Sequence, residues 1–281
     1  MRTRRLLIGY GLAVLFGMRG VLAGPATDTV VVCYSGGSVS QADANAAMGA
    51  MLRVVERVGQ WPSGHFASAF TVSTPECRGL LSAKKPSFAI MPLGVYLDRR
   101  RSDHWIPLVQ PRIDGRLAER YRLIVRKGTF SSLAALKGHS VGGTVLDDPE
   151  FLSRIVFAGQ ADSSSFLLRP SNQGIRALRS LDRGELDAVL LNEQQYNGLG
   201  ALGLASPLDV VFTSQEIPLL GLAADGVKST AEERSRFAKS LEAMCSDAEG
   251  KKLCDLFGIS AFVAVNAKAY DAAVQLWEKG G

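Results

Sequence analysis

The sequence predicts an α/β fold made of two lobes that are joined by two extended crossovers. The chain has 281 residues, which is enough for two modest domains. Short apolar runs alternate with helical patterns twice along it, first over residues 29–91 and again over residues 133–192. Each alternation is typical of a sheet that is covered by helices. Extended segments lead from the first unit to the second and back again, so the two units form a bilobed clamshell.

The first unit is predicted from β-branched runs that alternate with amphipathic stretches. The expected order is strand 29–34, helix 41–58, strand 66–72, helix 74–82 and strand 88–91. Apolar residues fall on one face of the first helix, and Thr74 with Pro75 forms a cap and first position for the second. Such an order indicates a parallel sheet with covering helices.

Extended segments at residues 106–113 and 120–125 lead into the second unit. The expected order there is helix 133–137, strand 140–144, helix 148–157, strand 166–168, helix 171–183 and strand 186–191. Further extended segments follow at residues 210–212 and 219–223, and the chain is then predicted to be helical from Thr230, with breaks near Gly250 and Gly258. We therefore expect lobe one to comprise residues 24–117 plus 216–281, and lobe two residues 118–215.

The N-terminus has the layout of a secretory signal peptide. Arg2, Arg4 and Arg5 precede an apolar run over residues 6–16, and small residues stand at the −3 and −1 positions of a cleavage site after Ala23. Removing residues 1–23 takes four Arg from 32 basic side chains and leaves 28 against 27 acidic ones. The basic balance therefore indicates export to the periplasm and gives no support to nucleic-acid binding. An uncleaved anchor is the alternative.

The four cysteines all lie in the mature chain, and in an oxidising compartment pairing is the default. Three connectivities are open from the sequence. The more local one joins Cys33 to Cys77 and Cys245 to Cys254. A metal site is the alternative, but the chain has no C-x-x-C and its three His are scattered. A soft-ligand site that uses a free Cys also stays open.

Several segments, in this order and spacing, resemble the phosphate, phosphite and phosphonate-binding family of periplasmic solute-binding proteins. They are YRLIVRKG at 121–128, LAALKGHSVG at 133–142, ALRSLDRGELDAV at 177–189, FTSQEIP at 212–218, LFGISAFV at 256–263 and YD at 270–271. The resemblance extends over residues 28–278. It implies a type II periplasmic-binding fold whose lobes close on a small solute, an ABC permease as partner, a monomer and no cofactor.

The resemblance places the ligand where strand ends and helix N-termini of the two lobes face each other. The loops expected there are 35–38 and 92–96 in lobe one, and 142–144, 171–173 and 192–193 in lobe two. The candidate ligand-binding residues in these loops are Ser35, Gly36, Tyr96, Thr144, Asn172, Asn192 and Glu193. Each has a structural alternative, such as a turn for Ser35 and Gly36 or a helix cap for Asn192.

The sequence departs from the family where an anion loop is expected. Asp147, Asp148 and Glu150 stand just after the strand at 140–144. Carboxylates there would repel a phosphate-like group, so we expect phosphate and simple phosphonates to bind more weakly than about 10 μM. The acids would face solvent instead if they only form the first turn of a helix.

Catalysis is not expected from this sequence. The motifs G-x-S-x-G, H-E-x-x-H and C-x-x-C are all missing, and none of the three His belongs to a recognisable catalytic motif. The leading prediction is an exported solute-binding protein that delivers a small polar or anionic solute to an ABC importer. The alternative is a periplasmic sensor on the same fold that presents its bound form to a receptor kinase.

Overall fold

The computed structural model describes residues 27–34, 41–171, 173–266 and 268–279. The predicted signal peptide and the candidate residues Ser35, Gly36 and Asn172 lie outside the described residues. Over the described ranges, no helix combines the length and apolar character that crossing a bilayer requires.

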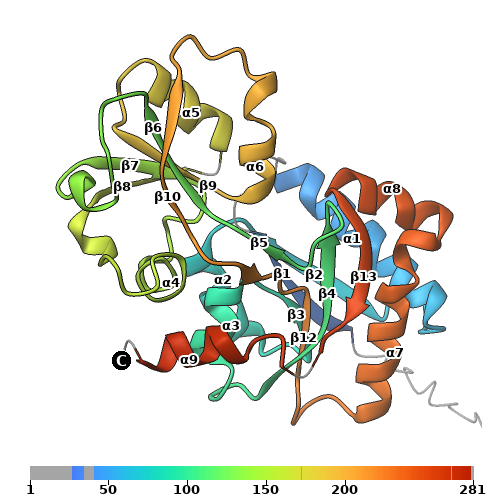
Figure 1. Ribbon diagram of the computed structural model, residues 1–281. Helices are drawn as coiled ribbons and strands as arrows, with labels where there is room; N and C mark the ends of the chain where they lie inside the picture. Colours follow the sequence, from blue (N-terminus) through green and yellow to red (C-terminus); the bar gives the residue numbers. More distant parts are fainter. Residues whose placement is uncertain (1–26, 35–40, 172, 267, 280–281) are drawn as a thin grey trace, which may run out of the picture.

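Lobe one is built on a six-stranded sheet in the order β13-β4-β12-β3-β1-β2 (Figure 1). Its strands are β1 (Asp28–Cys33), β2 (Phe66–Thr71), β3 (Phe88–Ile90), β4 (Trp105–Ile113), β12 (Leu222–Asp225) and β13 (Ile259–Ala264). β1 pairs in parallel with β2 and β3, whereas β12 and β13 pair antiparallel with their neighbours. The parallel pairing expected for the first three strands is confirmed, and the later strands β4, β12 and β13 make the whole sheet mixed.

Helices cover both faces of this sheet (Figure 1). One face carries α1 (Gln41–Val58), α7 (Ala231–Glu242) and α8 (Ala248–Leu256), and the other carries α2 (Thr74–Lys84), α3 (Leu93–Arg99) and α9 (Asp271–Lys279). Alternation along β1 produces the two cores: Val30 and Val32 pack with α1 and α7, while Val31 and Cys33 pack with α2 and α3.

Lobe two is built on a five-stranded sheet in the order β10-β6-β9-β7-β8. Its strands are β6 (Arg122–Arg126), β7 (Ser140–Gly143), β8 (Leu167–Pro170), β9 (Ala188–Leu191) and β10 (Leu208–Thr213). Its helices are α4 (Pro149–Phe151), which continues as a π-helical turn over Leu152–Val156, α5 (Gly174–Asp182) and α6 (Glu193–Asn197). Single 3-10 turns cover Ala134–Leu136, Ser163–Ser165 and Leu199–Ala201, and a further one in lobe one covers Met244–Ser246.

Two short strands join the lobes. β5 (Ala118–Glu119) and β11 (Ile217–Pro218) pair antiparallel, so that Glu119 lies opposite Ile217. They belong to neither large sheet, and β5 lies between the two sheets in Figure 1. Because both crossovers meet in this pair, any change in the angle between the lobes must be absorbed there.

Two elements differ from the sequence-based expectation. Residues 93–99 form α3, although Pro92-Leu93-Gly94 was expected to be a loop; Pro92 provides the extended residue before the helix. Residues 259–264 form strand β13 at the sheet edge, in a region that was expected to be helical. Gly258, at a φ of 67°, allows the chain to turn from α8 into this strand.

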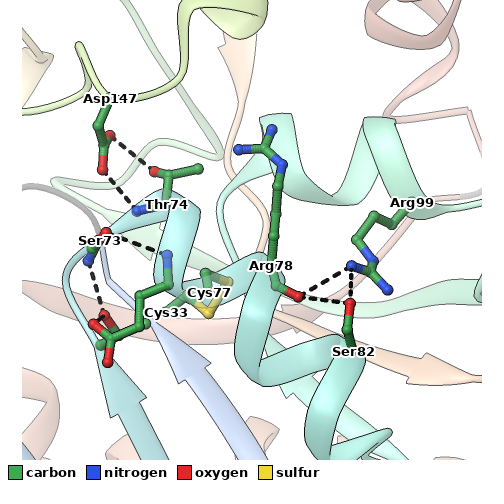
Figure 2. Close-up of a disulfide and its surroundings, with 10 residues drawn as sticks. Cys33, Ser73, Thr74, Cys77, Arg78, Ser82, Arg99 and Asp147 are labelled. Atoms are coloured by element: carbon green, nitrogen blue, oxygen red, sulfur yellow. Dashed lines mark hydrogen bonds between the residues drawn. A yellow bond between two sulfur atoms is a disulfide. The ribbon is translucent and has the colours of Figure 1, made fainter.

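Both cysteine pairs are disulfide-bonded. Cys33 at the end of β1 is joined to Cys77 in α2, as Figure 2 shows, and Cys245 is joined to Cys254 in α8. The first bond ties the sheet to the helix whose N-terminus faces lobe two. No cysteine is free, so the soft-ligand alternative has no thiol to use.

Candidate ligand-binding site

A cavity of about 210 Å³ lies where lobe one, lobe two and both crossovers meet. Lobe one contributes the ends of β1 and β3, with Tyr34 and Pro92–Gly94, together with residues of α1, α8 and β13. Val145, Asp148 and Phe151 line it from lobe two, and Glu119, Tyr121 and residues 217–221 line it from the crossovers. A ligand here would touch every part that moves when the lobes open, which is the geometry that a clamshell binding protein needs.

Glu119 is the central polar group of this cavity. The Tyr121 hydroxyl donates a hydrogen bond to Glu119 Oε1 over 2.9 Å. Burial raises the pKa of Glu119 to about 7, although the bond from Tyr121 lowers it and the charge of Glu193 raises it further. Burial and the Glu119 charge in turn raise the pKa of Tyr34. The site therefore holds a carboxyl group that changes its charge near neutral pH.

The raised pKa of Glu119 predicts that stability falls with rising pH. The carboxyl has an ordinary pKa of 4.5 when unfolded and about 7 when folded, so the folded state binds the extra proton between these values. The stability of the unliganded protein should therefore decrease from about pH 4.5 to about pH 7, by up to about 3 kcal/mol. Urea unfolding across this range measures the effect.

Glu119→Gln should remove this part of the pH dependence, because the amide is neutral and its oxygen still accepts from Tyr121. Glu216→Gln is the matched control, since Glu216 lies on the neighbouring crossover with a side chain that is 63% exposed. Parallel stability profiles for wild type and Glu119→Gln would contradict the assignment.

Acidic residues of lobe two fasten it to lobe one. Asp147 accepts hydrogen bonds from the backbone N–H of Thr74 over 2.7 Å and from the Thr74 hydroxyl over 3.0 Å, as Figure 2 shows. Asp148 pairs with Arg78 over 3.2 Å, while Arg78 also bonds Asp98. A carboxylate from lobe two thus occupies the N-terminus of α2, where free N–H groups would otherwise favour an anion.

The three acids that were expected to repel an anion therefore lie in different places. Asp147 and Asp148 lie at the contact between the lobes, and Asp148 also caps α4 through the N–H of Phe151. Glu150 points away and pairs with Arg154 over 2.8 Å. The helix-turn alternative is thus correct for Glu150, and partly correct for Asp148.

Gly94 lies at a close contact between the lobes beside this cavity. A Cβ at this position would come within 2.8 Å of the Phe151 Cβ and would also overlap Asp148 Oδ2. The close approach of α3 to α4 therefore requires glycine.

The four described candidate residues from the sequence lie outside this cavity. Tyr96 is buried in α3, with its ring 5.7 Å from that of Tyr270. Thr144 and Asn192 are linked through Gln195, which donates to the Thr144 hydroxyl over 3.2 Å and forms a capping box with Asn192. The structural alternatives account for Tyr96 and Asn192.

Glu193 belongs to a network that joins lobe two to the first crossover. It pairs with Arg122 over 3.2 Å, with Arg116 over 3.5 Å, and accepts from the backbone N–H of Arg120. Burial opposes its ionisation, but these partners, Arg122 above all, hold the pKa of Glu193 below its usual value. Its carboxylate is thus already paired, and it is poorly placed to meet a ligand.

Within the described part of the chain, no group of three or more His, Cys, Asp and Glu could hold a metal ion. Glu119 and Tyr121 line the cavity but were not among the candidate ligand-binding residues of the sequence analysis. The sequence does place an acid and a tyrosine beside an extended crossover, which could have suggested a polar site there. It does not show that β5 pairs with β11.

The comparisons with known proteins agree with this architecture. The family described as "ABC transporter, phosphonate, periplasmic substrate-binding protein" matches residues 38–270. No protein with curated annotation matches the chain significantly by sequence.

Solved structures share the fold at low sequence identity. A binding protein component of an ABC phosphonate transporter from Pseudomonas aeruginosa has a TM-score of 0.67 at 16% identity, covering 89% of this chain and 86% of its own. PhnD1 from Prochlorococcus marinus in complex with methylphosphonate has a TM-score of 0.67 at 14% identity, covering 91% and 98%. An ancestral arginine-binding protein bound to arginine has a TM-score of 0.51 at 17% identity, covering 82% and 96%.

These neighbours are type II periplasmic-binding proteins, and the two α/β lobes described above have the same architecture. The family match extends over most of the chain. The chain belongs to the family of periplasmic substrate-binding proteins of phosphonate ABC transporters, and is a solute-binding component of an ABC importer.

Proposed function

We propose that this protein captures one small solute in the cavity between its lobes and releases it unchanged to its ABC permease. The observation that carries the proposal is the convergence of both lobes and both crossovers on one cavity. Lobe closure would bury the solute, and the closed form would be the one that the permease recognises.

The moving parts are proposed to be lobe one, residues 24–117 plus 216–281, and lobe two, residues 118–215. The pairing of β5 with β11 supports this division, because it separates the two large sheets. The contacts of Thr74 with Asp147 and of Arg78 with Asp148 would break when the lobes open. We propose that the protein works as a monomer, as the resemblance to solute-binding proteins implies.

Export follows from the N-terminal sequence. The periplasmic protein is proposed to lose residues 1–23, so that it begins near Gly24. Protein from an exporting host should show this N-terminus by intact mass and should titrate no free thiols after denaturation. Two or more free thiols in that preparation would contradict the oxidised state.

An ATPase assay with the permease tests the proposed role directly. Solute-loaded protein should stimulate ATP hydrolysis by its own permease in proteoliposomes, and the solute should be recovered unaltered. Stimulation of a receptor kinase instead, without any effect on the permease, would favour the sensory alternative. Recovery of a chemically altered solute would show that the protein is an enzyme.

A further inference from the structure

We propose that the cavity takes a compact, largely apolar organic cation whose amino group binds Glu119, and that phosphonate-type anions are poor ligands. The inference rests on the proposed function and names the class of solute for the same cavity.

The cavity is small and mostly apolar. Its volume is about 210 Å³. The apolar side chains that line it include Val32, Met48, Met51, Ile90, Pro111, Ile113, Val145, Leu219, Leu220, Leu253, Ile259 and Phe262. Such walls suit a hydrocarbon body of a few carbon atoms or one ring, and give little to a strongly hydrated anion.

The charge of the lining is negative. Among the described lining residues there is no Lys, Arg or His, and the two acids are Glu119 and Asp148. Asp148 is neutralised by Arg78, whereas no described basic side chain forms an ion pair with Glu119. The titratable groups that bear on Glu119 are Tyr121, Tyr34 and Glu193, and none of them is cationic. A partly buried carboxylate such as that of Glu119 is stabilised by a partner of opposite charge, and here the ligand can supply it.

Among the described lining residues, donors for an anion are correspondingly scarce. The Thr74 N–H and hydroxyl at the start of α2 already bind Asp147. An anion would have to displace this carboxylate and remain beside Glu119 and Asp148. A cation need not displace Asp147, which keeps its bonds to Thr74, and its desolvation is offset by pairing with Glu119.

Aromatic rings also line the cavity. Tyr34, Tyr121, Phe151 and Phe257 all line the cavity, and the rings of Tyr34 and Phe257 lie 5.6 Å apart, edge to face. Ring faces attract ammonium groups and also accept an apolar body. The aromatic lining thus favours both the ammonium group and the apolar body of the proposed ligand.

Three probes of similar size, benzylamine, benzyl alcohol and benzoate, separate charge from shape, and methylphosphonate is added as a small phosphonate anion. By calorimetry at about pH 8, we expect benzylamine to bind at least about tenfold more tightly than benzyl alcohol, and the two anions to bind more weakly still. Benzylamine affinity should also fall as the pH is lowered to about 6, because Glu119 becomes protonated.

Glu119→Gln should lower benzylamine affinity by about tenfold or more and leave benzyl alcohol affinity unchanged, since the shape of the cavity is kept. The control Glu216→Gln should change neither. Binding of benzylamine that is unaffected by Glu119→Gln would overturn the proposal.

The binding results distinguish failure of the cation proposal from failure of the proposed function. Tighter binding of methylphosphonate or benzoate than of benzylamine would overturn the cation proposal, and the protein would still be a solute-binding protein. Binding of none of the four probes, together with no thermal shift from phosphate, phosphite, sulfonates or small organic acids, would overturn both.

Discussion

Replacing Cys33 and Cys77 together by alanine is expected to destabilise the protein by about 4 kcal/mol. The disulfide joins residues 44 positions apart, so its loss releases a long loop in the unfolded chain. Cys33 and Cys77 are also buried between β1 and α2, and the substitution leaves the packing there incomplete. Urea unfolding of the oxidised proteins measures the loss.

The second disulfide provides the matched comparison. Cys245 and Cys254 are only 9 positions apart, and the same loop argument gives about 2.5 kcal/mol for their replacement by alanine. A larger loss for this pair than for Cys33 and Cys77 would contradict the loop-closure account.

Gly94→Ala is expected to keep the lobes from closing fully. The new methyl group would meet the Phe151 Cβ at 2.8 Å, and backbone or helix α4 would have to move to accommodate it. Since Val145, Asp148 and Phe151 form the lobe-two wall of the cavity, affinity for the tightest probe should drop about 100-fold, or roughly 2.7 kcal/mol. Small-angle scattering should show a more open molecule.

Gly79→Ala is the control for this substitution. Gly79 also lies in a helix of lobe one, but a Cβ there meets nothing within 4 Å. This variant should keep wild-type affinity and scattering. Unchanged affinity and scattering in Gly94→Ala would show that the contact between α3 and α4 does not limit closure.

Local sequence patterns predicted much of the fold, because they show where apolar residues recur with the period of a strand or a helix and where the chain turns. Apart from α3 and β5, the order of strands and α-helices from β1 to β9 follows from β-branched runs, helix caps and glycine stops. The local disulfide pairing was also favoured. By contrast, α3 was missed because Pro92 and Gly94 together are typical of a loop, and β13 was missed because its partner β4 is about 150 positions away.

The site was harder to predict than the fold. The segment 92–96 was expected at the cleft, and it lines the cavity at Pro92, Leu93 and Gly94 but not at Val95 and Tyr96. Glu193 was expected to face the ligand, but its carboxylate is paired with Arg122 and Arg116, which lie over 70 positions earlier in the sequence. The position of Glu119 in the cavity depends on the pairing of β5 with β11, which the sequence did not predict. Ion pairs and strand pairs between distant residues decide which acids remain available, and a single sequence does not show them.

A crystal structure of the protein grown with benzylamine at about pH 8 tests the central claim most directly. The account predicts the ligand between Tyr34, Glu119 and Val145, with its amino group at hydrogen-bond distance from the Glu119 carboxylate and both lobes in contact with it. Benzylamine bound elsewhere on the protein, with this cavity holding only solvent, would contradict the account.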